Sequence, residues 1–199
     1  MTWQARASTL TLLLVANFAA GDVIPAPWGI VVVLAALVTA MLYYRGFWRA
    51  AAGGLIGGAV AGLLILGPGF RLAMRAVALM DPVHPEEFTL EGTVFIVIGI
   101  GGVLGAIQGA TAHLARRAFG IDSAVIAGLL LATYMMVELT FFAGELSQEI
   151  FDLGLGAWVN IPLFGLIALG YGIAAMAVAD RVESSLPTRR PTDRAKVAA

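Results

Sequence analysis

AAAGGLIGGAVAGLLILGPGF, residues 50–70, is an uncharged apolar run that ends in Gly-Pro-Gly. A helix that crosses a bilayer needs about 20 predominantly apolar residues, and this run is long enough. Arg71 and Arg75 follow it directly. The stretch therefore predicts a transmembrane helix that carries two positive charges just beyond its apolar part. We expect the helix to break at Gly-Pro-Gly and a short amphipathic helix to hold both arginines on one face, since they are four residues apart.

The composition of the whole chain supports a membrane protein. Of its 199 residues, 60% are hydrophobic and 13% are charged, whereas a soluble domain has about 25% charged residues. The formal net charge of −1 argues against nucleic-acid binding, which needs a basic surface. The chain has no cysteine, which excludes disulfides and cysteine-ligated metal centres. We expect no cofactor.

Further apolar runs predict the number of spans. Uncharged runs cover residues 23–44, 93–112 and 159–179, and Glu138 alone interrupts the run at 123–142. The first apolar run, residues 7–21, is shorter, so it is either a cleaved signal peptide or a first helix, and we expect a retained helix. The predicted fold is therefore all-α, a polytopic transmembrane bundle of six spans.

The positions of the basic residues predict the orientation of these spans, because cytoplasmic segments are enriched in Lys and Arg. With the N-terminus inside, ten of the twelve basic residues are cytoplasmic: Arg6, Arg45, Arg49, Arg116, Arg117, Arg181, Arg189, Arg190, Arg194 and Lys196. The exceptions are Arg71 and Arg75. We expect a protein of the bacterial cytoplasmic (inner) membrane with both termini in the cytoplasm. We expect residues 1–180 to form the transmembrane domain and residues 181–199 to form a flexible basic tail.

Glycines recur every four residues in two of the predicted spans. Gly54, Gly58 and Gly62 lie on one helix, and Gly101, Gly105 and Gly109 lie on another. Small residues at this spacing allow helices to approach closely. Two interpretations stay open: packing within the chain, or an interface with a partner membrane subunit or a second copy.

Polar residues at membrane depth are candidate functional residues because burying them is costly. Glu138 lies roughly one helical turn inside the outer boundary, close to the expected level of Arg71. Glu138 is either the counter-ion of Arg71 or a protonatable carboxyl group. Arg71 and Arg75 either pair with acidic groups and lipid phosphates, or bind an anion or lipid headgroup, which paired guanidiniums hold well. We expect His113 to lie at the inner membrane interface.

Three segments carry a resemblance to other proteins. RLAMRAVAL (71–79), FTLEGT (88–93) and GYGIAAMAVADRVE (170–183) resemble elements of a group of small multipass membrane proteins of high-GC bacteria. The resemblance covers about residues 50–183. It implies the same multipass topology and an important arginine element, and it carries no activity.

The leading functional hypothesis is a non-enzymatic membrane protein. Arg71, Arg75 and Glu138 would form an outward-facing site for an anionic or lipid-like ligand, or the chain would seat a partner subunit. The first alternative is a substrate-binding or membrane subunit of a transporter. The second is an intramembrane lipid-modifying enzyme with Glu138 as general base, for which the sequence offers no accompanying nucleophile or metal site.

Overall fold

The computed structural model describes residues 46–80, 89–141 and 156–187, and this part of the chain is helical, with no strand. Three of its helices are long and apolar enough to cross a membrane, namely Phe47–Leu79, Leu90–Phe119 and Trp158–Ser185. They contain three of the predicted spans. The first two predicted spans, residues 7–21 and 23–44, lie outside the described residues.

The first long helix is continuous through Gly-Pro-Gly. It consists of α3 (Phe47–Ala61), the π-helical segment η1 (Gly62–Leu66) and α4 (Gly67–Leu79). The predicted break at this point is therefore wrong. Proline has no N–H to donate, and within an α-helix its ring collides with the preceding turn. In η1 the N–H of Gly67 donates to the Gly62 carbonyl, five residues earlier, and this wider turn directly precedes Pro68.

The second long helix also contains a π-helical segment. It runs through α5 (Leu90–Val94), η2 (Phe95–Leu104) and α6 (Gly105–Phe119). Its N-terminus is capped by Thr89, whose side chain accepts a hydrogen bond from the Gly92 N–H. η2 has the sequence FIVIGIGGVL, in which glycines and β-branched residues give a low intrinsic preference for the α-helix. The helix ends at Gly120, which has a positive φ of 71°.

Two further helices follow, α7 (Ala124–Phe141) and α9 (Ala157–Ser185). α7 confirms a helix at the predicted fifth span. α9 continues beyond the predicted end of the last span at residue 179, and it includes the first residues of the predicted tail. The physical reason is that Glu183, near its C-terminal end, is bonded to side chains of α6.

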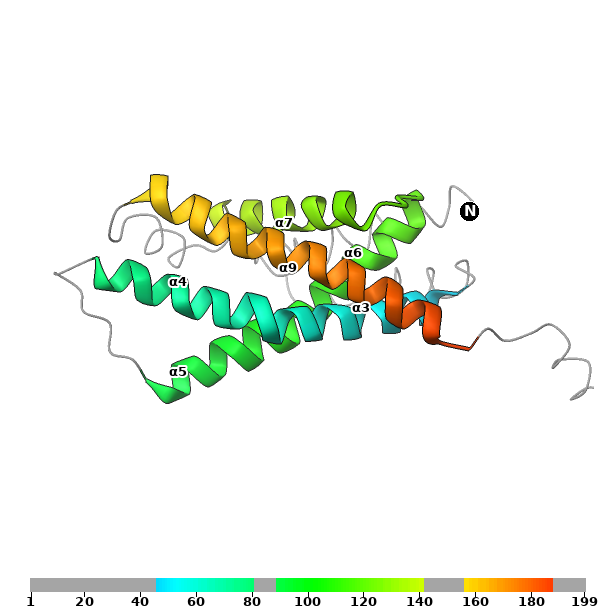
Figure 1. Cartoon of the computed structure of the whole chain (residues 1–199), viewed down its shortest axis with the longest axis horizontal. Coiled ribbons are helices and arrows are strands. Elements are labelled where there is room, and N and C mark those ends of the chain that lie inside the picture. Colours follow the sequence, from blue (N-terminus) through cyan, green and yellow to red (C-terminus); the bar gives the residue numbers. More distant parts are fainter. Residues whose placement is uncertain (1–45, 81–88, 142–155, 188–199) are drawn as a thin grey trace, which may run out of the picture.

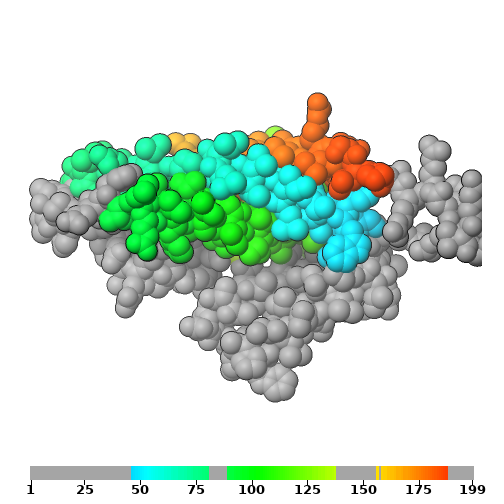
Figure 2. All heavy atoms as spheres, turned by 90° about the horizontal axis from the view of Figure 1, so that it is seen from below, coloured from blue at the N-terminus to red at the C-terminus, as the bar shows by residue number. Residues whose placement is uncertain are grey.

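Successive helices run in opposite directions along the bundle (Figure 1). α3 packs against both α6 and α9, and α7 packs on α9. Figure 2 shows α3, in cyan, beside the green α5–η2–α6 helix on one face. The axes of α4 and α5 diverge toward one end of the molecule. The most deeply buried large side chains include Leu66, Phe164, Tyr171 and Met176.

The glycine-rich faces of α3 are in close contact with other helices of the same chain. A Cβ atom on Gly58 would overlap the Gly105 carbonyl, and one on Gly62 would overlap the Gly101 carbonyl. On the other side of α3, a Cβ atom on Gly53 would lie 2.8 Å from the Ala179 carbonyl oxygen of α9. These glycines therefore serve packing within the chain, the first of the two interpretations, because any side chain would force the backbones apart.

Candidate functional site

The predicted arginine site lies where α4 meets α5. Nε of Arg71 donates a hydrogen bond to Oγ1 of Thr93 over 3.2 Å. The Thr93 hydroxyl donates in turn to the Thr89 carbonyl over 3.0 Å. Thr93 therefore links the guanidinium to the backbone of the neighbouring helix, a role that the sequence did not reveal. Arg75 lies one turn further along α4 and is exposed.

The third predicted site residue, Glu138, belongs to α7. Its side chain lies outside the described residues, so the pairing of Arg71 with Glu138 stays a prediction. Within the described residues, the structure brings Arg71 together with Thr93. Two features of the sequence were available to indicate the contact of Thr93 with Arg71. Thr93 carries a hydroxyl at the start of the predicted fourth span, and it lies one helical turn after Thr89.

A second group of polar residues lies toward the other end of the bundle, and we call it the charge cluster. It comprises His113, Arg116 and Arg117 of α6, Asp180 and Glu183 of α9, and Arg49 of α3. Arg116 and Arg117 lie three and four positions after His113, and Glu183 lies three positions after Asp180, so each set lies on one side of its helix. The cluster joins three helices that are distant in sequence.

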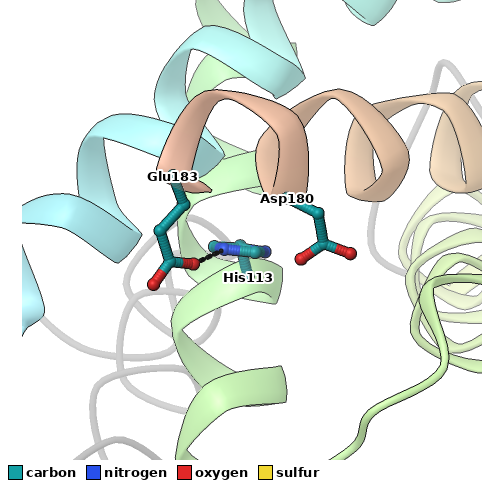
Figure 3. A group of neighbouring side chains, drawn as sticks. All are labelled: His113, Asp180 and Glu183. Atoms are coloured by element: carbon teal, nitrogen blue, oxygen red, sulfur yellow. Dashed lines mark hydrogen bonds and ion pairs between the residues drawn. The ribbon is translucent and has the colours of Figure 1, made fainter. Parts of the chain in front are cut away.

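His113 is the most deeply buried member of the cluster, with an exposed fraction of 0%. Its Nε2 atom lies 2.7 Å from Oε2 of Glu183. The imidazole ring lies between the carboxylates of Glu183 and Asp180 (Figure 3). α9 continues past residue 179 and covers the ring, so His113 is buried within the protein. Its expected position at the inner membrane interface stays a prediction.

Arg116 is nearly as buried, and it binds three groups. Its Nη1 donates to Oδ2 of Asp180 over 2.7 Å, and its Nε donates to the Ile121 carbonyl over 2.8 Å. Its Nη2 donates to the Asp122 carbonyl. This one guanidinium therefore fixes the turn between α6 and α7 and also attaches α6 to α9.

Arg117 and Arg49 complete the cluster at its surface. Nη2 of Arg117 lies 2.8 Å from Oε2 of Glu183, the oxygen that also contacts His113. Nη2 of Arg49 donates to the backbone carbonyl of Glu183 over 2.7 Å. A carbonyl near the C-terminal end of a helix carries partial negative charge, so the guanidinium of Arg49 stabilises the end of α9.

The charge cluster contains three possible metal ligands. Donor atoms of His113, Asp180 and Glu183 lie within 4.8 Å of one another. Both carboxylates already bind the guanidiniums of Arg116 and Arg117, and Arg49 adds a third positive charge at the Glu183 backbone carbonyl. A divalent cation would therefore meet repulsion and would have to displace existing ion pairs. The arrangement favours attachment of one helix to another over metal binding.

Sequence reasoning missed this cluster, although a signal was present. The predicted fourth span is followed by a histidine and two arginines, and the predicted last span is followed by two acidic residues at matching spacing. Helices that run in the same direction side by side would bring these complementary sets to the same level. Comparisons with protein-family models, with curated proteins and with solved structures find no match, so the geometry of the two polar groups is what bears on function.

Proposed function

We propose that this chain is a non-enzymatic, multi-pass protein of the bacterial cytoplasmic membrane that binds an anionic or lipid-like ligand at its outward end. Arg71, Arg75 and Glu138 are the proposed ligand-binding residues. The observation that carries the proposal is the hydrogen bond from Nε of Arg71 to Thr93 on the facing helix. It holds the plane of the guanidinium in place, and a pre-oriented guanidinium loses less entropy when it binds a carboxylate or phosphate.

The proposed topology has six spans with both termini in the cytoplasm. In support, Arg49, Arg116 and Arg117 gather toward one end of the described helices, whereas Arg71 and Arg75 lie toward the other. The end that holds the charge cluster is cytoplasmic by the distribution of positive charge.

The orientation can be tested by cysteine labelling, because the natural chain has no cysteine. Leu90→Cys lies at the start of α5, and Ser185→Cys lies at the end of α9. In intact cells, a membrane-impermeant maleimide should label Leu90→Cys and should label Ser185→Cys only after lysis. Labelling of Ser185→Cys in intact cells would overturn the proposed orientation.

Ligand binding is best tested by native mass spectrometry of protein from nanodiscs that contain phosphatidylglycerol and phosphatidylcholine. The Arg71→Ala and Arg75→Gln variants should retain severalfold less phosphatidylglycerol than the wild type, with phosphatidylcholine unchanged. Arg181→Gln is the matched control, because Arg181 is also an exposed helical arginine and lies at the opposite end. Equal retention of phosphatidylglycerol by the wild type and Arg71→Ala would remove the basis for the site.

A membrane subunit of a transporter is the second candidate, and one observation favours it. The π-helical segment η1 lies near the middle of its helix, η2 extends to the middle of its own, and the two contact each other at Gly62 and Gly101. Irregular helices at the midplane are typical of transporter binding sites. A partner subunit or a second copy also belongs to the proposal, and it would use surfaces other than the glycines buried between α3, α6 and α9.

A further inference from the structure

The two halves of the second long helix differ in how many of their residues are buried. α6 buries six residues, namely Gly105, Gln108, Gly109, His113, Arg116 and Ala118. α5 buries none, and η2 buries only Ile96 and Gly101. α5 therefore has little packing to hold it in one position, whereas η2 contacts η1 at Gly62 and Gly101. α6 is held by the charge cluster and by the glycine contacts with α3.

The helix opposite α5 is firmly packed. Phe70 of α4 stacks edge-to-face on Phe164 of α9, with ring centroids 5.2 Å apart. Ala73 and Phe164 are 2% and 1% exposed. α4 is therefore attached to the body of the bundle, and motion between α4 and α5 would be motion of α5.

Among the residues that the structure describes, one hydrogen bond and one close backbone approach join α5 and the start of η2 to α4. One is the hydrogen bond between Arg71 and Thr93. The other is the close approach of Gly67 to Val97, where a Cβ atom on Gly67 would lie 2.7 Å from the Val97 Cα. The hydrogen bond is the more distant of the two from α6, so it controls the position of α5.

η2 supplies a place at which the helix can change its winding. At its C-terminal end the N–H of Gly105 donates to the Ile100 carbonyl, five residues earlier, whereas an α-helix uses the fourth. A change from π to α bonding shifts the preceding helix by one residue, which is a rotation of about 100° and a translation of about 1.5 Å. Such a rotation would carry Thr93 away from Arg71.

We infer that α5 is a movable arm, that η2 is its pivot, and that the hydrogen bond between Arg71 and Thr93 is the latch that holds the arm against α4. The inference concerns the chain itself and needs no bound ligand. Release of the latch lets η2 rewind and turns α5 relative to α4, while the packed halves of the bundle keep their positions.

The arm can be observed with pairs of spin labels in the cysteine-free chain, using distance measurements on protein in nanodiscs. The reporting pair is Leu79→Cys with Leu90→Cys, at exposed positions of α4 and α5. The reference pair is Leu55→Cys with Ile107→Cys, at exposed positions of α3 and α6. Thr93→Val removes the latch acceptor and nearly preserves side-chain volume, and Thr93→Ser retains the hydroxyl.

Thr93→Val should at least double the fraction of molecules whose spin–spin distance in the reporting pair lies outside the main peak of the wild-type distribution. Thr93→Ser should match the wild type, and the reference pair should be unchanged in every variant. A Thr93→Val distribution that superimposes on that of the wild type would overturn the latch. Equal changes in the reference pair would also overturn the inference, because the whole bundle would then have changed.

The role of η2 as the pivot can be tested with one glycine-to-alanine substitution in η2 and a matched control in α9. A Cβ atom on Gly99 of η2 would meet only the ring of Phe95 within 4 Å, at 3.6 Å, and a Cβ atom on Gly165 of α9 would meet nothing within 4 Å. Gly99→Ala should therefore favour α winding of η2 without a clash, and should at least double the shifted fraction of the reporting pair. Gly165→Ala should have no effect. An unchanged distribution in Gly99→Ala would refute the role of η2 as pivot.

Discussion

Nε2 of His113 on α6 and Nη2 of Arg117 on the same helix both contact one oxygen, Oε2 of Glu183 on α9, over 2.7 Å and 2.8 Å. A single carboxylate oxygen of α9 thus binds two side chains of α6 that lie about 70 positions earlier in the sequence. The contact explains why α9 remains helical and attached beyond the apolar part of its span. The stability of the bundle should therefore be sensitive to substitution of Glu183.

Glu183→Gln should destabilise the bundle by about 1–3 kcal/mol, because the buried imidazole and Arg117 lose their charged partner. The measurement is thermal unfolding in detergent, followed by the fluorescence of the four tryptophans. Glu91→Gln, at an exposed position of α5, is the control. Equal unfolding temperatures for both variants would contradict a structural role for Glu183.

Arg116→Met and Arg117→Met should differ strongly, although the two arginines are adjacent. Arg116 is 4% exposed and Arg117 is 38% exposed. Removal of one partner from a buried ion pair costs about 3–5 kcal/mol, whereas an exposed pair contributes about 0–1 kcal/mol. Chemical denaturation should therefore place Arg116→Met far below Arg117→Met in stability. Similar losses in both variants would mean that burial does not determine the strength of these contacts.

Gly58→Ala should disturb the contact between α3 and α6, because the added methyl group overlaps the Gly105 carbonyl. Overpacking of this kind costs about 1–3 kcal/mol or more. The yield of monodisperse protein and its unfolding temperature should both fall. Gly165→Ala adds the same methyl group in open space and should leave both quantities unchanged. A fully stable Gly58→Ala protein would show that α3 and α6 can separate without cost.

Tyr171→Phe should cost about 1 kcal/mol, because the hydroxyl donates to the Gly105 carbonyl over 2.6 Å in the buried core. The ring is retained, so the packing of α9 against the glycine contact is preserved. Tyr171→Ala removes the ring as well and should cost several kcal/mol, about 3–5 by analogy with other large aromatic side chains. Equal losses in the two variants would assign the whole contribution of Tyr171 to its hydrogen bond.

Three of the long apolar helices could be predicted because their signal is local. Residues 50–70, 93–112 and 159–179 are apolar over a bilayer's thickness, and each lies inside a helix long enough to cross a membrane. The helix ends were harder to place. Pro68 indicated a break, but a π turn in η1 lets the helix continue, and ion pairs with α6 extend α9 to Ser185.

The candidate site was predictable only in part. The position of Arg71 and Arg75 at a span end follows from the order of apolar and charged residues. The bond from Arg71 to Thr93 depends on how α4 and α5 meet, and no local pattern contains that information. The contacts of the charge cluster could not be predicted for the same reason, because its complementary residues are on α6 and α9, which are separated in sequence by α7.

The sequence by itself determined that this is a helical protein with helices long and apolar enough to cross a membrane, because apolar length and the scarcity of charge act residue by residue. It also determined which helices have glycine faces. Only the tertiary structure decided that these faces meet each other within the chain and that His113 is buried between two acidic residues of α9. The physical reason is that contacts between helices depend on their rotation and level, which are set jointly by all the packed surfaces.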